Sequence, residues 1–258
     1  SGPLTSLGID DNATSTAITI DASQNVGIGT ASPSALLDVM SASNPSIKVR
    51  SNGGTVGNYA ELTLQSYNNY SGSGQTFIRG VSSASGNSDT DLTFGTNSSG
   101  FGAPVERMRI DSAGRVTMPY QPAFLVRPAS TQTDIPINAA TTIVFATEIF
   151  DQNADFASNT FTAPVAGKYQ LSTLCYAKDL DIGTLYYQLQ LVTSNRTYSN
   201  PIGTSGFDAD MLYYGFVISV LADMDAGDTA YVRLDIPNSG AAQVDIETPS
   251  YFSGYLVA

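Results

Sequence analysis

Short runs of alternating apolar and polar residues recur along the chain, and clusters of Gly, Asn, Ser and Pro separate them. Within residues 185–193, for example, Leu189 and Leu191 fall on one face of an extended segment. This alternation is typical of strands with one buried face, whereas no long window places apolar side chains at helical spacing. The chain is therefore predicted to be all-β.

The charge balance restricts the kinds of partner. The chain carries 11 Lys and Arg against 23 Asp and Glu, so its formal net charge at pH 7 is −12. A surface of this sign repels nucleic-acid phosphates and anionic lipid headgroups. No apolar run approaches the roughly 18 residues of a spanning helix. We therefore expect no nucleic-acid partner and no membrane insertion.

Histidine is absent, and Cys175 is the only cysteine. These absences exclude the usual His general base, His-activated nucleophiles and most zinc sites. The four Glu residues fall in no recognisable catalytic motif. The chain is predicted not to be an enzyme.

Two parts of the chain differ in pattern. Up to about residue 119 the apolar runs are too short for an independent core, and residues 20–28 resemble residues 110–118 as strand, tight turn and strand. Beyond residue 120 the expected strands are longer, as in a two-sheet sandwich. They span 167–177, 185–193, 211–222, 229–236 and 250–257. We expect a shaft-like β domain over 1–119 and a head domain over 120–258.

The first part resembles the shafts of bacteriophage tail fibres and tailspikes. Residues 25–33, which read Asn-Val-Gly-Ile-Gly-Thr-Ala-Ser-Pro, are similar to a segment common in that family, as are residues 106–110 before Gly114. The resemblance implies a β-rich shaft in which three chains intertwine. It also implies a homotrimer on a virion, outside the cell, with upstream fibre or tail proteins as partners.

The second part resembles the globular head of the C1q family. The residues in the order and near the spacings of its signature are Phe145, Asp151, Phe156, Phe161, Gly167, Tyr169 and Leu171. Leu171 stands where the family has an aromatic residue. Residues 225–228 resemble the family's Gly-Asp turn, and residues 250–257 resemble its closing strand. The resemblance implies a jelly-roll sandwich of the C1q and tumour necrosis factor type, assembled as a trimer.

Candidate binding residues lie in the head. C1q-like heads often bind calcium near the trimer apex, and a rough alignment places Asp208 and Asp210 there, so calcium is the one candidate cofactor; a solvated loop is the alternative. Residues 195–210 are rich in Asn, Ser, Gly and Tyr, as adaptable recognition surfaces are. The receptor-binding loop is expected to use Asn195, Arg196, Tyr198, Asn200 and Phe207.

Three functions remain open at this stage. The favoured one is a trimeric phage tail fibre tip that attaches to a bacterial surface glycan or protein receptor. A bacterial surface or spore-coat adhesin with a C1q-like head is the second, although no collagen-like Gly-X-Y stalk is present. A tailspike polysaccharide hydrolase, which would need two carboxylates in a groove, is the third.

Overall fold

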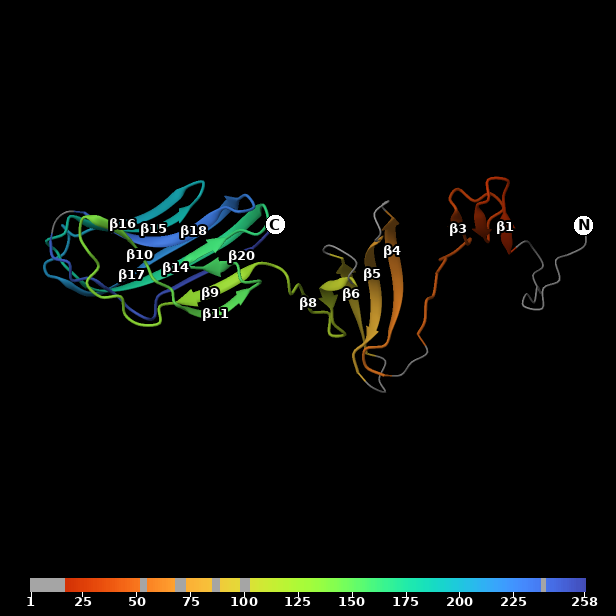
Figure 1. Cartoon of the computed structure of the whole chain (residues 1–258), viewed down its shortest axis with the longest axis horizontal. Coiled ribbons are helices and arrows are strands. Elements are labelled where there is room, and N and C mark those ends of the chain that lie inside the picture. The colour runs from red at the N-terminus through yellow and green to blue at the C-terminus, as the bar shows by residue number, and fades with distance from the viewer. Residues whose placement is uncertain (1–16, 52–54, 68–72, 85–88, 98–102, 238–239) are drawn as a thin grey trace, which may run out of the picture.

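The computed structural model describes residues 17–51, 55–67, 73–84, 89–97, 103–237 and 240–258. All the regular secondary structure in these ranges is β-strand, which confirms the predicted all-β class. None of these residues belongs to a helix that could cross a membrane. Figure 1 shows a three-stranded sheet, a five-stranded sheet and then two six-stranded sheets along the long axis.

The strands before the sandwich are β1 (Ile18–Ile20), β2 (Val26–Ile28), β3 (Leu37–Val39), β4 (Tyr59–Tyr67), β5 (Ser73–Ser82), β6 (Thr90–Thr96), β7 (Val105–Ile110) and β8 (Val116–Thr117). Those of the sandwich are β9 (Ala123–Arg127), β10 (Ala139–Thr142), β11 (Thr147–Gln152), β12 (Phe156–Ala157), β13 (Thr160–Thr162), β14 (Gly167–Leu180), β15 (Tyr186–Thr193), β16 (Thr197–Gly203), β17 (Met211–Met224), β18 (Thr229–Ile236), β19 (Asp245–Ile246) and β20 (Tyr251–Leu256).

The Asn-Val-Gly-Ile-Gly-Thr segment forms β2 and the turn after it. A Cβ added to Gly27 would lie 2.5 Å from the carbonyl oxygen of Thr30, so only glycine lets the chain fold back this closely. Gly29 has a φ of 76°, and a Cβ there would overlap the carbonyl oxygen of Met40. Both glycines therefore shape the return of the chain to β3, which pairs parallel with β2.

The two similar sequence segments fold alike. Asp21 Oδ1 accepts a hydrogen bond from Asn25 N (2.9 Å) in the turn between β1 and β2. Asp111 Oδ1 accepts one from Arg115 N (2.9 Å) in the turn between β7 and β8. These hydrogen bonds hold the pKa of both carboxyls below their ordinary range. The predicted strand, turn and strand pattern is confirmed in both copies.

The head is a sandwich of two sheets with one core between them. One sheet has the order β12-β13-β18-β15-β16, with β10 beside β18, and the other has the order β11-β9-β20-β14-β17, with β19 beside β14. Aromatic residues fill this core, since Phe161, Tyr169 and Phe252 are all fully buried. Phe124 contacts this cluster, with its ring centroid 4.7 Å from that of Phe161.

Glycine and aspartate in the signature segment have structural roles. A Cβ on Gly167 would lie 2.6 Å from the carbonyl oxygen of Ala258, and one on Gly254 would lie 2.6 Å from Leu171 Cδ2. Asp151 accepts hydrogen bonds from the backbone N–H groups of Asp155 and Phe156 (3.1 and 2.9 Å). The two glycines let neighbouring segments approach closely, and Asp151 stabilises a turn.

Candidate binding surfaces

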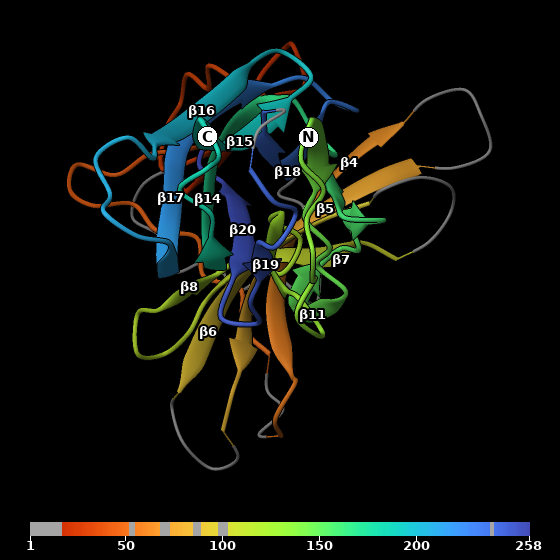
Figure 2. The same cartoon turned by 90° about the vertical axis from the view of Figure 1, so that its left-hand side faces the viewer.

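The head has two distinguishable ends. Pro122 O accepts a hydrogen bond from Leu256 N (3.1 Å), and Ala258 O accepts one from Lys168 N (2.7 Å), so the chain enters and leaves the sandwich side by side. We call this the link end. The opposite end, which faces the viewer in Figure 2, is the far end.

The predicted receptor-binding segment 195–210 is not one loop. Its middle, Thr197–Gly203, is β16, an edge strand that pairs antiparallel with β15. A strand of seven residues spans roughly 20 Å, so Asn195 lies at the link end and Phe207 at the far end. The expectation of one continuous loop is wrong because this edge strand contains Asn200 and Pro201, residue types that are depleted in strands.

Two predicted contact residues are engaged at the link end. The Asn195 side-chain amide donates to Asp223 O (3.1 Å) and to Asp228 Oδ2 (2.9 Å). Arg196 forms an ion pair with Asp223, and this contact lowers the pKa of the Asp223 carboxyl. Both side chains tie the β15–β16 turn to the neighbouring turn, so their contacts within the chain are structural.

Two more of the predicted receptor-binding residues lie on β16 itself. Tyr198 is partly buried and packs against the core of the sandwich. The Asn200 side-chain amide donates to Val217 O (3.1 Å) on β17. The structure thus gives Tyr198 a packing role and Asn200 a role in closing the edge between the two sheets.

Phe207, Asp208 and Asp210 share the far end, where hydrogen bonds hold three segments together. Asp181 is central: its N–H donates to the hydroxyl of Tyr187 (2.8 Å), and its carboxylate accepts from Gly183 N (2.7 Å) and Ala241 N. Burial raises the pKa of Tyr187. The loop before β15 is thereby joined to residues 240–244, before β19.

Asp210 completes this arrangement. Its Oδ1 accepts a hydrogen bond from Ile182 N (3.0 Å), which ties the β16–β17 loop to the loop before β15. Ile182 and Leu185 remain exposed there, Leu185 to 68%. Sequence reasoning missed these two residues, although apolar side chains on both sides of Gly183 in a turn were a signal. The far end is a fixed surface with apolar and acidic groups.

Asp208 and Asp210 are the residues of the calcium hypothesis. In the part of the chain that the structure describes, no three His, Cys, Asp or Glu side chains converge as metal ligands would. Calcium takes six to eight oxygen ligands, whereas Asp208 and Asp210 supply few and Asp210 already accepts from Ile182. Calcium at the trimer apex therefore stays a prediction.

A second surface of the head carries exposed apolar side chains beside the hydrogen-bonded Gln170, Ser172 and Ser219. On β17 the side chains of Tyr213, Val217 and Leu221 point away from the core and are 47%, 53% and 54% exposed. The Tyr213 ring stacks on that of Tyr176 on β14, with centroids 5.3 Å apart. Tyr214, the next residue on β17, packs against the core. Strand alternation therefore turns one tyrosine of this pair outward.

The C1q domain family profile matches residues 123–257. The chain belongs to the C1q family. This confirms the predicted C1q-like jelly roll, within a family that has trimeric assembly and recognition or binding roles. C1q domains are typically non-enzymatic binding domains.

Solved structures of this fold are similar to the head. The globular domain of zebrafish complement 1qA protein is 18% identical, with a TM-score of 0.41 over 54% of this chain and 98% of that one. Murine APRIL at pH 8.0 is 9% identical, with a TM-score of 0.40; the match covers 53% of this chain and 99% of that one. No curated protein sequence matches the chain.

Proposed function

We propose that the chain is the receptor-binding end of a trimeric bacteriophage tail fibre and that it has no catalytic activity. The observation that carries this proposal is the joining of a C1q head to β-sheets in which Phe77 is the one buried hydrophobic side chain among the residues that the structure describes. Such sheets become stable only when they pack against further chains, and a C1q head belongs to a family that assembles as trimers. Head and stalk then share one threefold axis.

The apolar surface on β17 supports the trimer. Tyr213, Val217 and Leu221 are exposed apolar side chains on the outward face of β17, and exposed apolar side chains that gather on one face can mark an interaction site. An outward tyrosine suits an interface because its ring is buried while its hydroxyl finds a partner.

The choice of a phage fibre over a bacterial or spore-coat adhesin rests on residues 25–33 and 106–110. These segments resemble phage fibre shafts, and the collagen-like repeat of the alternative stalk is absent. On this reading the protein belongs to the virion, outside the cell. Upstream fibre or tail proteins and a bacterial surface glycan or protein are its partners.

Recognition is assigned to the far end of the head. The link end is occupied by the incoming chain, whereas the far end presents the exposed Asp208 and Leu185 and the partly exposed Phe207. Three copies of a weak site on one axis can raise the apparent affinity by a factor of about 100 when the bacterial surface is repetitive. Calcium at Asp208 and Asp210 stays a prediction and would need carboxylates from neighbouring chains.

Adsorption of labelled protein to candidate bacteria tests the proposal. Phe207→Ala at the far end should reduce adsorption at least about tenfold, because the loss at each site is multiplied through avidity. Asn195→Ala at the link end is the matched control and should adsorb like the native protein. Equal adsorption by both variants would remove the far end from the site.

Two further measurements separate the alternatives. Light scattering should give the mass of a trimer, and a monomer would overturn the fibre proposal. Release of reducing sugar from the bacterial envelope would replace it with the tailspike hydrolase. Addition of a chelator should lower adsorption only if calcium holds Asp208 and Asp210 together.

A further inference from the structure

The sheet formed by β4 to β8 is a single layer. Its strands pair in the order β4-β5-β6-β7-β8, and none of its side chains belongs to the buried core of the head. Figure 1 shows these strands running across the long axis of the molecule. A sheet that is apolar on one face is stable only when another element covers that face.

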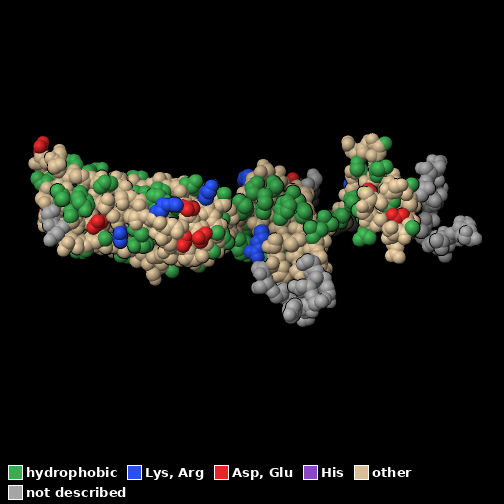
Figure 3. Space-filling view, turned by 90° about the horizontal axis from the view of Figure 1, so that it is seen from above, with side chains coloured by type: hydrophobic (Ala, Val, Ile, Leu, Met, Phe, Trp, Pro, Cys, Tyr) green, Lys and Arg blue, Asp and Glu red, His purple; other side chains and the backbone are tan. Residues whose placement is uncertain are grey.

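One face is apolar. The strand register places Leu62, Ile78, Phe94 and Met108 opposite one another in a row across four strands. Leu64 and Leu92 lie on the same side. We call these six residues the apolar face. Leu62 is 54% exposed, Leu64 57% and Ile78 38%, and Figure 3 shows hydrophobic side chains gathered over this part of the molecule.

The opposite face is polar and is covered by its own long side chains. The Arg79 guanidinium lies over the rings of Phe77 and Tyr59, 3.6 and 4.2 Å from their centroids, and pairs with Glu61. Phe77 is consequently only 4% exposed. This face needs no further partner.

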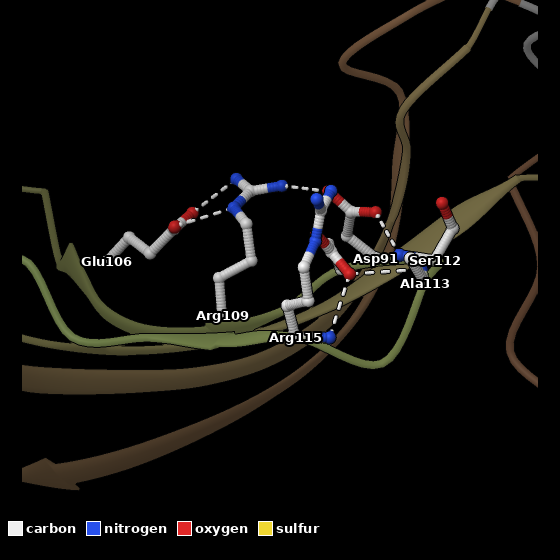
Figure 4. Close-up of polar contacts among 7 residues, drawn as sticks. Asp91, Glu106, Arg109, Ser112, Ala113 and Arg115 are labelled. Carbon is white, nitrogen blue, oxygen red and sulfur yellow. Dashed lines mark hydrogen bonds and ion pairs between the residues drawn. The ribbon is translucent and has the colours of Figure 1, made fainter.

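A bulge extends the polar network across the sheet. Residues three apart in a regular strand point to opposite faces, yet Glu106 and Arg109 form an ion pair (2.6 Å). The register shift between Phe94 and Gly95 makes this pair possible, because it turns Glu106 to the polar face. Arg109 also pairs with Asp91 (2.5 Å), as Figure 4 shows.

Charge indicates what covers the apolar face. The six residues that define it are uncharged, and Arg107 only borders it, donating to Thr96 Oγ1 (3.2 Å) and lying over the Tyr120 ring. A threefold assembly repeats every charge three times around its axis, so like charges in an interior shared by identical copies would repel one another. An uncharged, apolar face avoids this repulsion.

The connection to the head brings further copies within reach. Residues 118–122 are tied to the head, since Met118 O accepts from Gln152 Nε2 (3.0 Å) and Tyr120 O from Asn153 Nδ2 (3.1 Å). A short tether of this kind gives neighbouring sheets in a trimer an effective concentration near the millimolar range. We propose that the apolar face packs against the same face of two further copies, so that three sheets enclose one apolar interior. This inference rests on the trimer proposed above.

Cysteine accessibility in the full chain tests the proposal. Leu62→Cys reports on the apolar face, and Thr63→Cys, one residue along β4 and exposed on the polar face, is its matched control. In the trimer, maleimide should label Leu62→Cys at least about tenfold more slowly than Thr63→Cys. If Leu62→Cys does not fold, Leu64→Cys and Gln65→Cys form an equivalent pair.

Mass and labelling together distinguish the outcomes. Equal labelling rates in a protein that light scattering shows to be a trimer would overturn this inference and leave the trimeric fibre intact. A monomer would overturn the proposed function and this inference with it. Protection of Leu62→Cys in a monomer would mean that something other than a second copy covers the face.

Discussion

Phe77 lies over Gly95, the residue opposite it on the neighbouring strand. A Cβ built on Gly95 would overlap Cε1 of the Phe77 ring, and Arg79 covers the other side of that ring. The absence of a side chain at position 95 is therefore what allows the polar face to bury an aromatic residue. This relationship can be tested directly.

We expect Gly95→Ala to displace the Phe77 ring and to lower stability by about 1 to 3 kcal/mol, as overpacking does. Gly80→Ala is the control in the same sheet, because a Cβ there meets its nearest neighbour, Thr90 Cγ2, at an ordinary 3.4 Å. Chemical denaturation of both variants gives the comparison. A stability loss of equal size in both would mean that the overlap with the Phe77 ring is not its cause.

The turn between β7 and β8 depends on the conformation of Gly114. Its φ is 83°, in the left-handed region, while a Cβ there would meet nothing within 4 Å. Gly114→Ala should therefore destabilise by about 1 kcal/mol through backbone strain alone. Gly203→Ala on β16, which is equally open and has no positive φ, should leave the melting temperature unchanged or raise it.

Acid should weaken the five-stranded sheet. The hydrogen bond from Arg109 is the largest cause that holds the pKa of Asp91 below its ordinary value of 3.8. A carboxyl with a lowered pKa in the folded state stabilises above its ordinary pKa, and this stabilisation is lost as the pH falls through the lowered value. The melting temperature should drop below about pH 4 in the native protein. In Asp91→Asn the drop should be smaller, and an unchanged profile would contradict this assignment.

The thiol of Cys175 should be unreactive in the folded protein. It is fully buried in the core, and burial raises its pKa, so neither access nor a thiolate is available. A thiol reagent should detect it only after denaturation. Rapid labelling of the native chain would show that the core of the sandwich opens.

Much of the head could be predicted from alternation. The strand expected over residues 229–236 has those bounds as β18, and β15 begins one residue after its predicted start. In both strands every second side chain is buried, which gives the sequence a clear period. Strands that pack one face on the core can be predicted from the sequence for this reason.

β16 could not be predicted as readily. Asn200 and Pro201 are typical of turns, and only the partly buried Tyr198 and Ile202 carry the period of a strand. Its strand conformation depends on pairing with β15 across a short turn and on the hydrogen bond from Asn200 to β17, which the residues of β16 do not reveal by themselves. Because β16 runs through the predicted loop, the residues before it and the residues after it lie at opposite ends of the head.

The bulge in the five-stranded sheet was likewise hidden. The sequence Glu-Arg-Met-Arg reads as plain alternation, which would place Glu106 and Arg109 on opposite faces. Only the paired strand reveals the extra residue, through the register shift beside Gly95. A bulge is set by two strands together, and one segment read alone does not contain it.

The chain enters the head at β9, which has β11 on one side and β20 on the other. Hydrogen bonds between antiparallel strands lie perpendicular to the strands. Tension applied through residues 118–122 along β9 would therefore load the bonds of residues 123–127 in shear, all at once on both sides. The head is joined to the sheets before it by a connection that resists pulling, since those bonds must break together before β9 can slide.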